Sequence, residues 1–191
     1  MVRQSVQFEM NELSLRILSA LVMLPLVTVA IWFGDWIFVA LVVVLTASMS
    51  LEWLRICGIE SLGIRTTMVL FVATAPVFAL IDQFDAAWVF IALGTLVGVI
   101  RKNTINPRSR IIAALGMPYI GVTGIVIVLL RCDPLMGLET VLWLLCVVIA
   151  TDSAGYFVGR FVGGPKLFPR ISPKKTWSGL AGGVIAASVV G

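Results

Sequence analysis

The sequence predicts an all-α, polytopic transmembrane protein with about six spans and a truncated seventh. Of its 191 residues, 60% are hydrophobic and only 13% are charged, whereas soluble domains carry about 25% charged residues. The mean hydropathy is +1.07. A soluble chain this apolar could not cover its surface with polar groups, but a bilayer solvates Leu and Val side chains well.

The expected spans are apolar runs joined by short loops, and one span needs roughly 20 residues. The first run follows Arg3 and Arg16 as a signal peptide would. It lacks a clear small-residue cleavage site and leads at once into the second run, so we predict that it is retained. The third run is short. The seven runs are residues 17–33, 36–54, 67–81, 86–100, 111–130, 138–162 and 178–191.

The seventh run divides the chain into its expected parts. It has 14 residues, about 21 Å of helix, against a hydrocarbon core roughly 30 Å thick. We therefore expect the chain to end inside a span. Residues 1–150 are expected to form N-terminal transmembrane helices. Residues 151–191 are expected to hold a motif-bearing helix, a cytoplasmic loop and the start of the truncated span.

Charge distribution predicts the orientation. With the N-terminus in the cytoplasm, every one of the 14 basic residues except Arg131 lies in a cytoplasmic segment. Basic residues concentrate in cytoplasmic loops of membrane proteins, so the pattern predicts a bacterial inner-membrane protein with a cytoplasmic N-terminus. In a membrane protein the formal charge of +4 says little about nucleic acid, and we expect membrane lipid but no nucleic acid as a partner.

Pairs of glycines four residues apart recur in the apolar runs. They are Gly94/Gly98, Gly155/Gly159 and Gly179/Gly183. Such spacings let helix backbones approach closely in lipid. They favour helix packing within the chain, and a homodimer face is the alternative.

Candidate chemistry concentrates in residues 151–179. The chain contains no histidine, which excludes His-based catalysis and His metal sites within these residues. Asp152 follows the apolar residues 141–150. A carboxylate near membrane depth is costly and is usually functional or paired. Asp152 therefore predicts an anion or metal site at the cytoplasmic edge, unless it is paired with Arg160 or Lys166.

The second half of this stretch predicts a phosphate site. Ser172 is a favourable N-cap for a helix whose first residue is Pro173. The free N–H groups at such a helix start favour an anion. Lys174 and Lys175 would lie in its first turn, where cations oppose the helix dipole, so a bound phosphate would explain them. The alternative is an anchor to anionic lipid headgroups.

Two strings of residues resemble a known family. One runs from Asp152-Ser153 through Tyr156 to Gly159-Arg160, and the other is Ser172-Pro173-Lys174-Lys175-Thr176-Trp177, with Pro165-Lys166-Leu167 between them. Together they resemble the phosphatidate cytidylyltransferases (CDP-diglyceride synthases), which are polytopic membrane enzymes. The resemblance implies that CTP and phosphatidate are joined into CDP-diacylglycerol, with release of pyrophosphate and with Mg²⁺ as cofactor.

The resemblance also implies roles for residues. Asp152 would hold Mg²⁺ directly or through water, or would orient a lysine. The implied catalytic residues are Asp152 and Lys175, and the implied substrate-binding residues are Ser172, Lys174, Lys175, Arg160 and Lys166.

The sequence departs from the family pattern at two places. Ala154-Gly155 stands where the family often has Gly-Ala, and Ser178 where it often has Glu or Gln. The family's C-terminal acidic motif is absent from these 191 residues, so we expect this piece alone to be inactive. The alternative functions are a membrane transporter or channel component, and another CTP-dependent lipid enzyme such as a polyprenol kinase.

Overall fold

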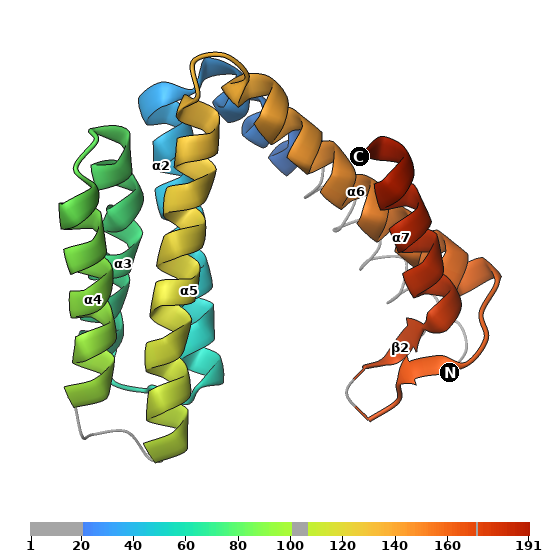
Figure 1. The fold of residues 1–191 in the computed structure, drawn as a ribbon. Coiled ribbons are helices and arrows are strands. Elements are labelled where there is room, and N and C mark those ends of the chain that lie inside the picture. The colour runs from blue at the N-terminus through green and yellow to red at the C-terminus, as the bar shows by residue number, and fades with distance from the viewer. Residues whose placement is uncertain (1–20, 101–106, 171) are drawn as a thin grey trace. The chain divides into compact units, whose positions relative to one another are not determined.

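The computed structural model describes residues 21–100, 107–170 and 172–191. These residues form seven helices and one short β-hairpin (Figure 1). The all-α polytopic class is confirmed, and the hairpin is an addition that the apolar runs did not predict. The elements are the helix Leu21–Phe33, α2 (Asp35–Ile56), α3 (Leu62–Leu80), α4 (Phe84–Ile100), α5 (Pro107–Cys132), α6 (Gly137–Phe161), β1 (Lys166–Phe168), β2 (Ser172–Thr176) and α7 (Trp177–Val190).

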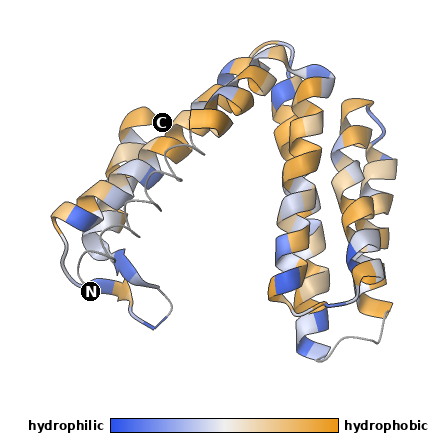
Figure 2. Cartoon of the chain, turned by 180° about the vertical axis from the view of Figure 1, so that it is seen from behind, coloured by the Kyte–Doolittle hydropathy of each residue, from blue (hydrophilic) through white to orange (hydrophobic). Residues whose placement is uncertain are grey.

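The helices follow the predicted apolar runs, but they differ in length. Among the described residues, α2, α3, α5 and α6 are long and apolar enough to cross a membrane. The helix Leu21–Phe33, α4 and α7 are shorter apolar helices. Most of the helical surface is hydrophobic (Figure 2), as expected of side chains that meet lipid.

The chain divides into two compact units, one ending at Leu135 and the other comprising Met136–Gly191. The division predicted between residues 150 and 151 falls inside α6, which is continuous across it. The first unit is a bundle in which each of the helices α3, α4 and α5 runs antiparallel to the helix before it in the chain (Figure 1). Leu54, Met68 and Met117 are fully buried in its core.

Glycines bring the helices of this bundle together. A Cβ on Gly94 would lie 2.8 Å from a methyl group of Val72, and one on Gly98 would lie 2.6 Å from the methyl group of Met68. Neither distance is compatible with a real side chain, so both glycines serve packing of α4 on α3. The prediction that this pair acts within the chain is confirmed, while the homodimer stays a prediction.

Arginines gather at one end of this unit. Arg55, Arg65 and Arg110 lie where α2 ends and where α3 and α5 begin. Asp82 lies between α3 and α4, and Asp85 lies in the first turn of α4, at the other end. The antiparallel order thus sorts the charges as the sequence predicted. Arg3, Arg16, Arg101 and Lys102, which the orientation argument also used, lie outside the described residues.

Arg131 is the one basic residue expected on the opposite side, and the structure gives it a specific role. Its Nε donates to the carbonyl of Ile31 at 2.7 Å, and its Nη2 donates to the carbonyl of Trp32 at 3.2 Å. These carbonyls belong to the last turn of the helix Leu21–Phe33, where a cation also offsets the helix dipole. A Cβ on Gly34, whose φ is +68°, would lie 2.5 Å from Nη2. Gly34 therefore leaves room for this cap.

We expect Arg131→Ala to loosen the end of the helix Leu21–Phe33. The variant loses two charge-assisted hydrogen bonds, each worth about 1.5–3 kcal/mol at most. Hydrogen–deuterium exchange at residues 30–33 should therefore become faster than in the unchanged protein, and the midpoint of thermal unfolding in detergent should fall. Arg55→Ala is the matched control, because Arg55 makes only an exposed pair with Glu52 at 3.6 Å. Equal exchange in the two variants would contradict the capping role.

Candidate functional site

The second unit is an antiparallel pair of helices, α6 and α7. They pack closely through Gly155, Gly159, Gly179 and Gly183, which we call the glycine seam. A Cβ on Gly179 of α7 would lie 2.7 Å from the carbonyl oxygen of Gly155 and 3.2 Å from Cα of Gly159, both on α6. A Cβ on Gly183 would lie 3.1 Å from the carbonyl oxygen of Thr151. The two helices therefore meet backbone to backbone. Packing within the chain, as predicted for these glycines, is confirmed.

A β-hairpin joins the two helices at one end of the pair. Lys166 of β1 pairs with Thr176 of β2, and Phe168 pairs with Ser172, in antiparallel register. Gly163 and Gly164 turn the chain out of α6 with φ values of +64° and +102°, a conformation that residues other than glycine rarely adopt. The hairpin thus follows α6 without a long linker and leads directly into α7.

Thr176 fixes the junction between the hairpin and α7. Its side chain is 5% exposed, and its Oγ1 accepts a hydrogen bond from the N–H of Gly179 at 3.2 Å, as an N-cap does. A Cβ on Gly159 would lie only 3.0 Å from this oxygen. The glycine seam and the helix cap therefore meet at one point.

Ser178 and Trp177 tie the same junction to the turn that follows α6. The hydroxyl of Ser178 donates to the carbonyl of Gly163 and lies 3.0 Å from Oγ1 of Thr176. The backbone N–H of Trp177 donates to the carbonyl of Pro165 at 3.1 Å. The end of α6, the turn and the start of α7 are consequently held in one arrangement, which positions both strands.

The predicted helix start at Ser172 and Pro173 is wrong. Ser172 pairs with Phe168 in β2, and α7 begins five residues later, at Trp177. The physical reason is that Thr176 supplies the cap, while antiparallel pairing with β1 keeps Ser172–Thr176 extended. Pro173 is tolerated there because a two-stranded sheet has only edge strands. A phosphate site at the N-terminus of a helix starting at Pro173 is thereby ruled out.

The lysines of the motif lie together on the hairpin. Lys166 lies on β1, and Lys174 and Lys175 lie next to each other on β2, where all three side chains are exposed. Lys166 pairs directly with Thr176, the residue that follows Lys175. The structure therefore brings these three predicted substrate-binding residues to one small sheet.

Arg160 lies in the last turn of α6, where the hairpin connection starts. Its Nη1 donates to the phenol oxygen of Tyr156 at 2.6 Å, and its guanidinium carbon lies 5.9 Å from the centre of that ring. The aromatic ring holds the guanidinium near the helix surface, where a cation–π contact is favourable. Sequence reasoning cited Tyr156 only as part of the motif and missed this role.

Asp152 is exposed on α6, about 12 Å along the helix axis from Arg160 by helical rise. It makes no ion pair with Arg160 or Lys166 and no hydrogen bond within the described part of the chain. The paired interpretation of Asp152 is therefore not supported. The structure does not bring Asp152 into contact with the lysines of the hairpin.

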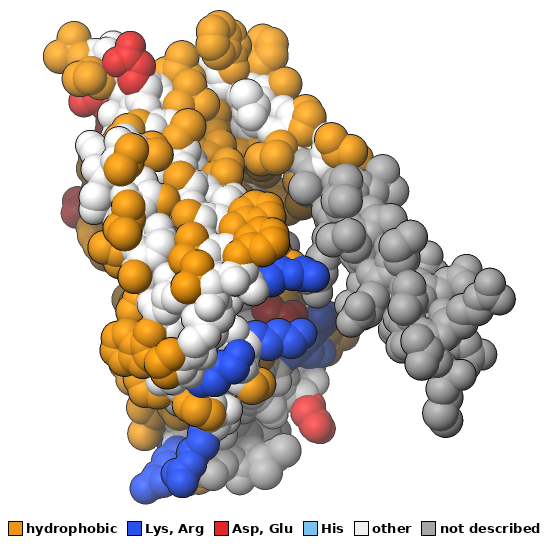
Figure 3. Space-filling view, turned by 90° about the vertical axis from the view of Figure 1, so that its right-hand side faces the viewer, with side chains coloured by type: hydrophobic (Ala, Val, Ile, Leu, Met, Phe, Trp, Pro, Cys, Tyr) orange, Lys and Arg blue, Asp and Glu red, His pale blue; other side chains and the backbone are white. Residues whose placement is uncertain are grey.

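The hairpin end of the second unit is strongly cationic. From residue 151 onward the basic residues are Arg160, Lys166, Arg170, Lys174 and Lys175, and Asp152 is the only acidic one. Figure 3 shows hydrophobic side chains over most of the face, with Lys and Arg side chains gathered toward its lower end. A cluster of cations without matching carboxylates favours polyanionic ligands such as phosphates.

The described residues offer a single carboxylate for Mg²⁺ here. No group of three or more His, Cys, Asp or Glu side chains that could hold a metal occurs among them. Mg²⁺ is commonly held by one or two carboxylates together with substrate phosphates and water. Asp152, which is exposed and unpaired, fits the role of one such ligand and no more.

Sequence reasoning also missed Thr176 and Ser178 as the residues that hold the hairpin. A signal was present, because Thr176 directly precedes the apolar run that becomes α7, and threonine is a good N-cap. Ser172 before Pro173 was the more conspicuous cap pattern. Only the pairing of β1 with β2 distinguishes the two.

Comparison with known proteins gives consistent matches. The model of the Cytidylyltransferase family matches residues 14–191. The phosphatidate cytidylyltransferase of Brucella suis biovar 1 (strain 1330) is 32% identical over 181 residues, which are 93% of this chain and 66% of that protein. The chain thus spans just under two thirds of the length of this relative. The phosphatidate cytidylyltransferase of Bacillus subtilis (strain 168) is 34% identical over 110 residues, 58% of this chain and 41% of that protein.

A shorter match has a higher sequence identity. The phosphatidate cytidylyltransferase of Haemophilus influenzae (strain ATCC 51907 / DSM 11121 / KW20 / Rd) is 47% identical over 58 residues, 30% of this chain and 20% of that protein. No solved structure gives a significant match.

We expect Thr176→Val to loosen the start of α7, because valine keeps the shape of threonine but cannot accept the hydrogen bond from Gly179. Loss of an N-cap costs about 0.5–2 kcal/mol. Faster hydrogen–deuterium exchange at residues 177–180 is the expected result, and Thr176→Ser should restore most of the protection. Thr123→Val is the control, because Thr123 bonds only the carbonyl of Tyr119 in its own helix. Unchanged exchange in Thr176→Val would contradict the capping role.

Proposed function

The chain belongs to the Cytidylyltransferase family, and on that premise we propose that the protein is a phosphatidate cytidylyltransferase of phospholipid biosynthesis. It would transfer the cytidylyl group of CTP to phosphatidate, giving CDP-diacylglycerol and pyrophosphate. The observation that carries the proposal is the cationic hairpin at the end of an apolar helix pair. Three exposed lysines lie there beside a membrane helix, in a chain whose relatives are named for this activity.

The location suits two substrates that arrive from different phases. CTP comes from water, and phosphatidate lies in the leaflet with its phosphate at the surface. A hairpin at the end of the helix pair meets both, because its lysines are exposed while the adjoining helices are apolar. The cations would then draw two anionic groups together against their mutual repulsion.

The reaction needs no covalent bond to the protein. An oxygen of the phosphatidate phosphate attacks the α-phosphorus of CTP, and the bond from that phosphorus to the pyrophosphate oxygen breaks. Positioning and charge neutralisation supply catalysis of this kind. Lys174, Lys175 and Lys166 would hold phosphate oxygens as point charges, Arg160 would contact a phosphate from the end of α6, and the hydroxyl of Ser172 would donate a hydrogen bond.

Asp152 would serve as one ligand to Mg²⁺, directly or through water. When bound, Mg²⁺ neutralises the triphosphate and the leaving pyrophosphate. The homodimer suggested by the glycine spacings also remains a proposal.

We further propose an inner-membrane protein whose hairpin faces the cytoplasm. The support is the sorting of Arg and Lys to one end of each unit and the exposure of the hairpin. Lys and Arg are retained in cytoplasmic loops. The same orientation places the lysines on the side where CTP is made.

Two native cysteines test this orientation. Cys57 follows α2 at the basic end of the first unit, and Cys132 ends α5 at the opposite end. In single-cysteine variants, a membrane-impermeant maleimide applied to intact spheroplasts should label Cys132, and should label Cys57 only after permeabilisation. Burial raises the pKa of the Cys57 thiol, so less thiolate is present at neutral pH and labelling of Cys57 should become faster as pH rises. Labelling of Cys57 in intact spheroplasts would reverse the orientation.

In a form of the protein that also carries the family's C-terminal acidic motif, we expect Lys174→Ala and Lys175→Ala to lower kcat/KM for CTP by about 10–100-fold, because a charged hydrogen bond contributes about 1.5–3 kcal/mol. Radiolabelled CTP turnover with phosphatidate in nanodiscs, with analysis of the lipid product, is the measurement. A phosphorylated polyprenol instead of CDP-diacylglycerol would favour a polyprenol kinase.

Arg170→Ala is the matched control, because Arg170 is an exposed cation of the same hairpin that the motif does not assign to substrate. If the lysines merely anchor the hairpin to lipid, all three variants should behave alike. Loss confined to Lys174→Ala and Lys175→Ala supports binding of substrate phosphate.

A further inference from the structure

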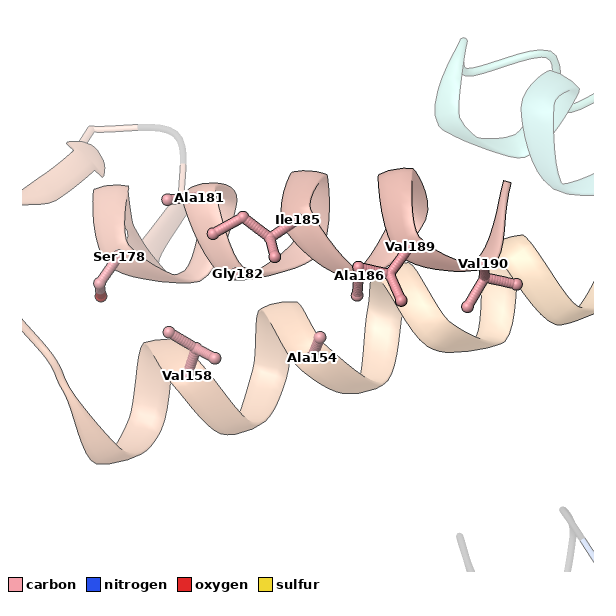
Figure 4. Close-up of a pocket in the computed structure, with 9 residues that line it drawn as sticks. All are labelled: Ala154, Val158, Ser178, Ala181, Gly182, Ile185, Ala186, Val189 and Val190. Atoms are coloured by element: carbon pink, nitrogen blue, oxygen red, sulfur yellow. The ribbon is translucent and has the colours of Figure 1, made fainter.

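An apolar groove follows the α6–α7 pair (Figure 4). It has a volume of about 610 Å³, within the range of about 300–1,000 Å³ typical of small-molecule sites. Ala154 and Val158 line it from α6, and one face of α7 from Ser178 to Val190 lines the rest. Four of the nine lining residues are Ala or Gly, and their small side chains leave the space open.

The lining restricts the occupant to an apolar group. Ser178 is the only polar residue of the lining, and its hydroxyl proton is already donated to the carbonyl of Gly163. From Ser178 to Val190 the groove follows α7 for about 18 Å by helical rise. A buried polar group without a partner would be costly along this whole length. The occupant must therefore be a continuous hydrocarbon.

The two ends of the groove differ in charge. At the Ser178 end lies the hairpin, with Lys174 four residues and Lys175 three residues before Ser178, and with Arg160 two residues after Val158. At the other end lies Val190, whose carbonyl accepts a hydrogen bond from Nε1 of Trp143 at 3.3 Å. An occupant with an apolar tail and an anionic head would complement both ends.

We propose that this groove holds one acyl chain of an anionic glycerophospholipid, the phosphatidate substrate, with the lipid phosphate at the hairpin. The proposal rests on the proposed function, since that function supplies the lipid. It assigns Ile185, Ala186 and Val189 as residues that set acyl-chain preference. A second transmembrane helix would match the apolar lining, but an apolar helix supplies no anionic group for Lys174 and Lys175 at the Ser178 end.

Photolabelling of the unaltered protein in nanodiscs tests binding without any variant. The probe is a phosphatidate with a diazirine near the end of one acyl chain, and the matched probe is a phosphatidylcholine with the same chain. We expect the phosphatidate probe to label peptides containing residues 185–190, at the end of the groove away from the hairpin, and the labelling to be lost with excess phosphatidate. Equal labelling by both probes would show ordinary lipid contact and overturn the proposal. Labelling elsewhere, with the groove unlabelled, would also overturn it and would point to a protein segment as the occupant.

A groove-filling variant, made in a form of the protein that also carries the C-terminal acidic motif, tests the consequence for selectivity. Ala186→Leu places a larger side chain in the groove, while Ser188→Leu adds bulk at an exposed position of α7 outside the lining. We expect Ala186→Leu to lower kcat/KM for long-chain phosphatidate by about tenfold, a typical penalty for a misfit in an apolar pocket. Short-chain phosphatidate should be used as before, and Ser188→Leu should change neither.

Equal losses on long and short chains in Ala186→Leu, with unchanged hydrogen–deuterium exchange of α6 and α7, would overturn the selectivity role. The two proposals fail in different ways. If a form that also carries the C-terminal acidic motif binds the phosphatidate probe in the groove but forms no CDP-diacylglycerol, the proposed function fails and the groove assignment stands. If it forms product but the groove is unlabelled, the reverse holds.

Discussion

The close approach of α6 and α7 is the constraint on which the second unit depends. Gly179 faces Gly155 and Gly159 so closely that a Cβ on Gly179 would lie 2.7 Å from the carbonyl oxygen of Gly155, which leaves no space for a side chain at Gly179. In lipid, apolar side chains gain little by leaving their surroundings, so helices associate through packing and hydrogen bonds. Backbone contact maximises that packing. It also brings Thr176 beside Gly159, so the cap of α7 and the direction of the hairpin are set by the same contact.

The hairpin gives the charged segment between α6 and α7 an ordered backbone outside the hydrocarbon core. Five cations follow residue 159 before α7 begins, and such charges are costly within the hydrocarbon core. Backbone that leaves a helix at the membrane surface also needs partners for its N–H and C=O groups. The β1–β2 pairing and the bond from Trp177 to Pro165 supply several of these partners. The lysines are thereby presented on ordered backbone rather than on a free loop.

Sequence alone predicted what depends on local composition. Long apolar runs predicted the helices, and basic residues predicted which ends of the helices lie together, because both signals are read within one segment. The capping role of Arg131 was not predictable, since its partner Ile31 is 100 residues away. The prediction of where the last helix begins was wrong for a related reason. Ser172 and Thr176 are both acceptable N-caps, and strand pairing with Lys166–Phe168 decides between them.

The same distinction explains why the candidate site was predicted in part. Lys174 and Lys175 were identified by type and spacing, and the structure places them with Lys166 on one hairpin. Their geometry differs from the prediction, because extended backbone directs adjacent side chains to opposite faces of a strand, whereas a first helical turn would have placed them about 100° apart. Two lysine side chains on opposite faces of a strand cannot both bind one phosphate as two side chains in a first helical turn could. They are better suited to two phosphates on either side of the strand, as the proposed joining of a nucleotide to a phospholipid would require.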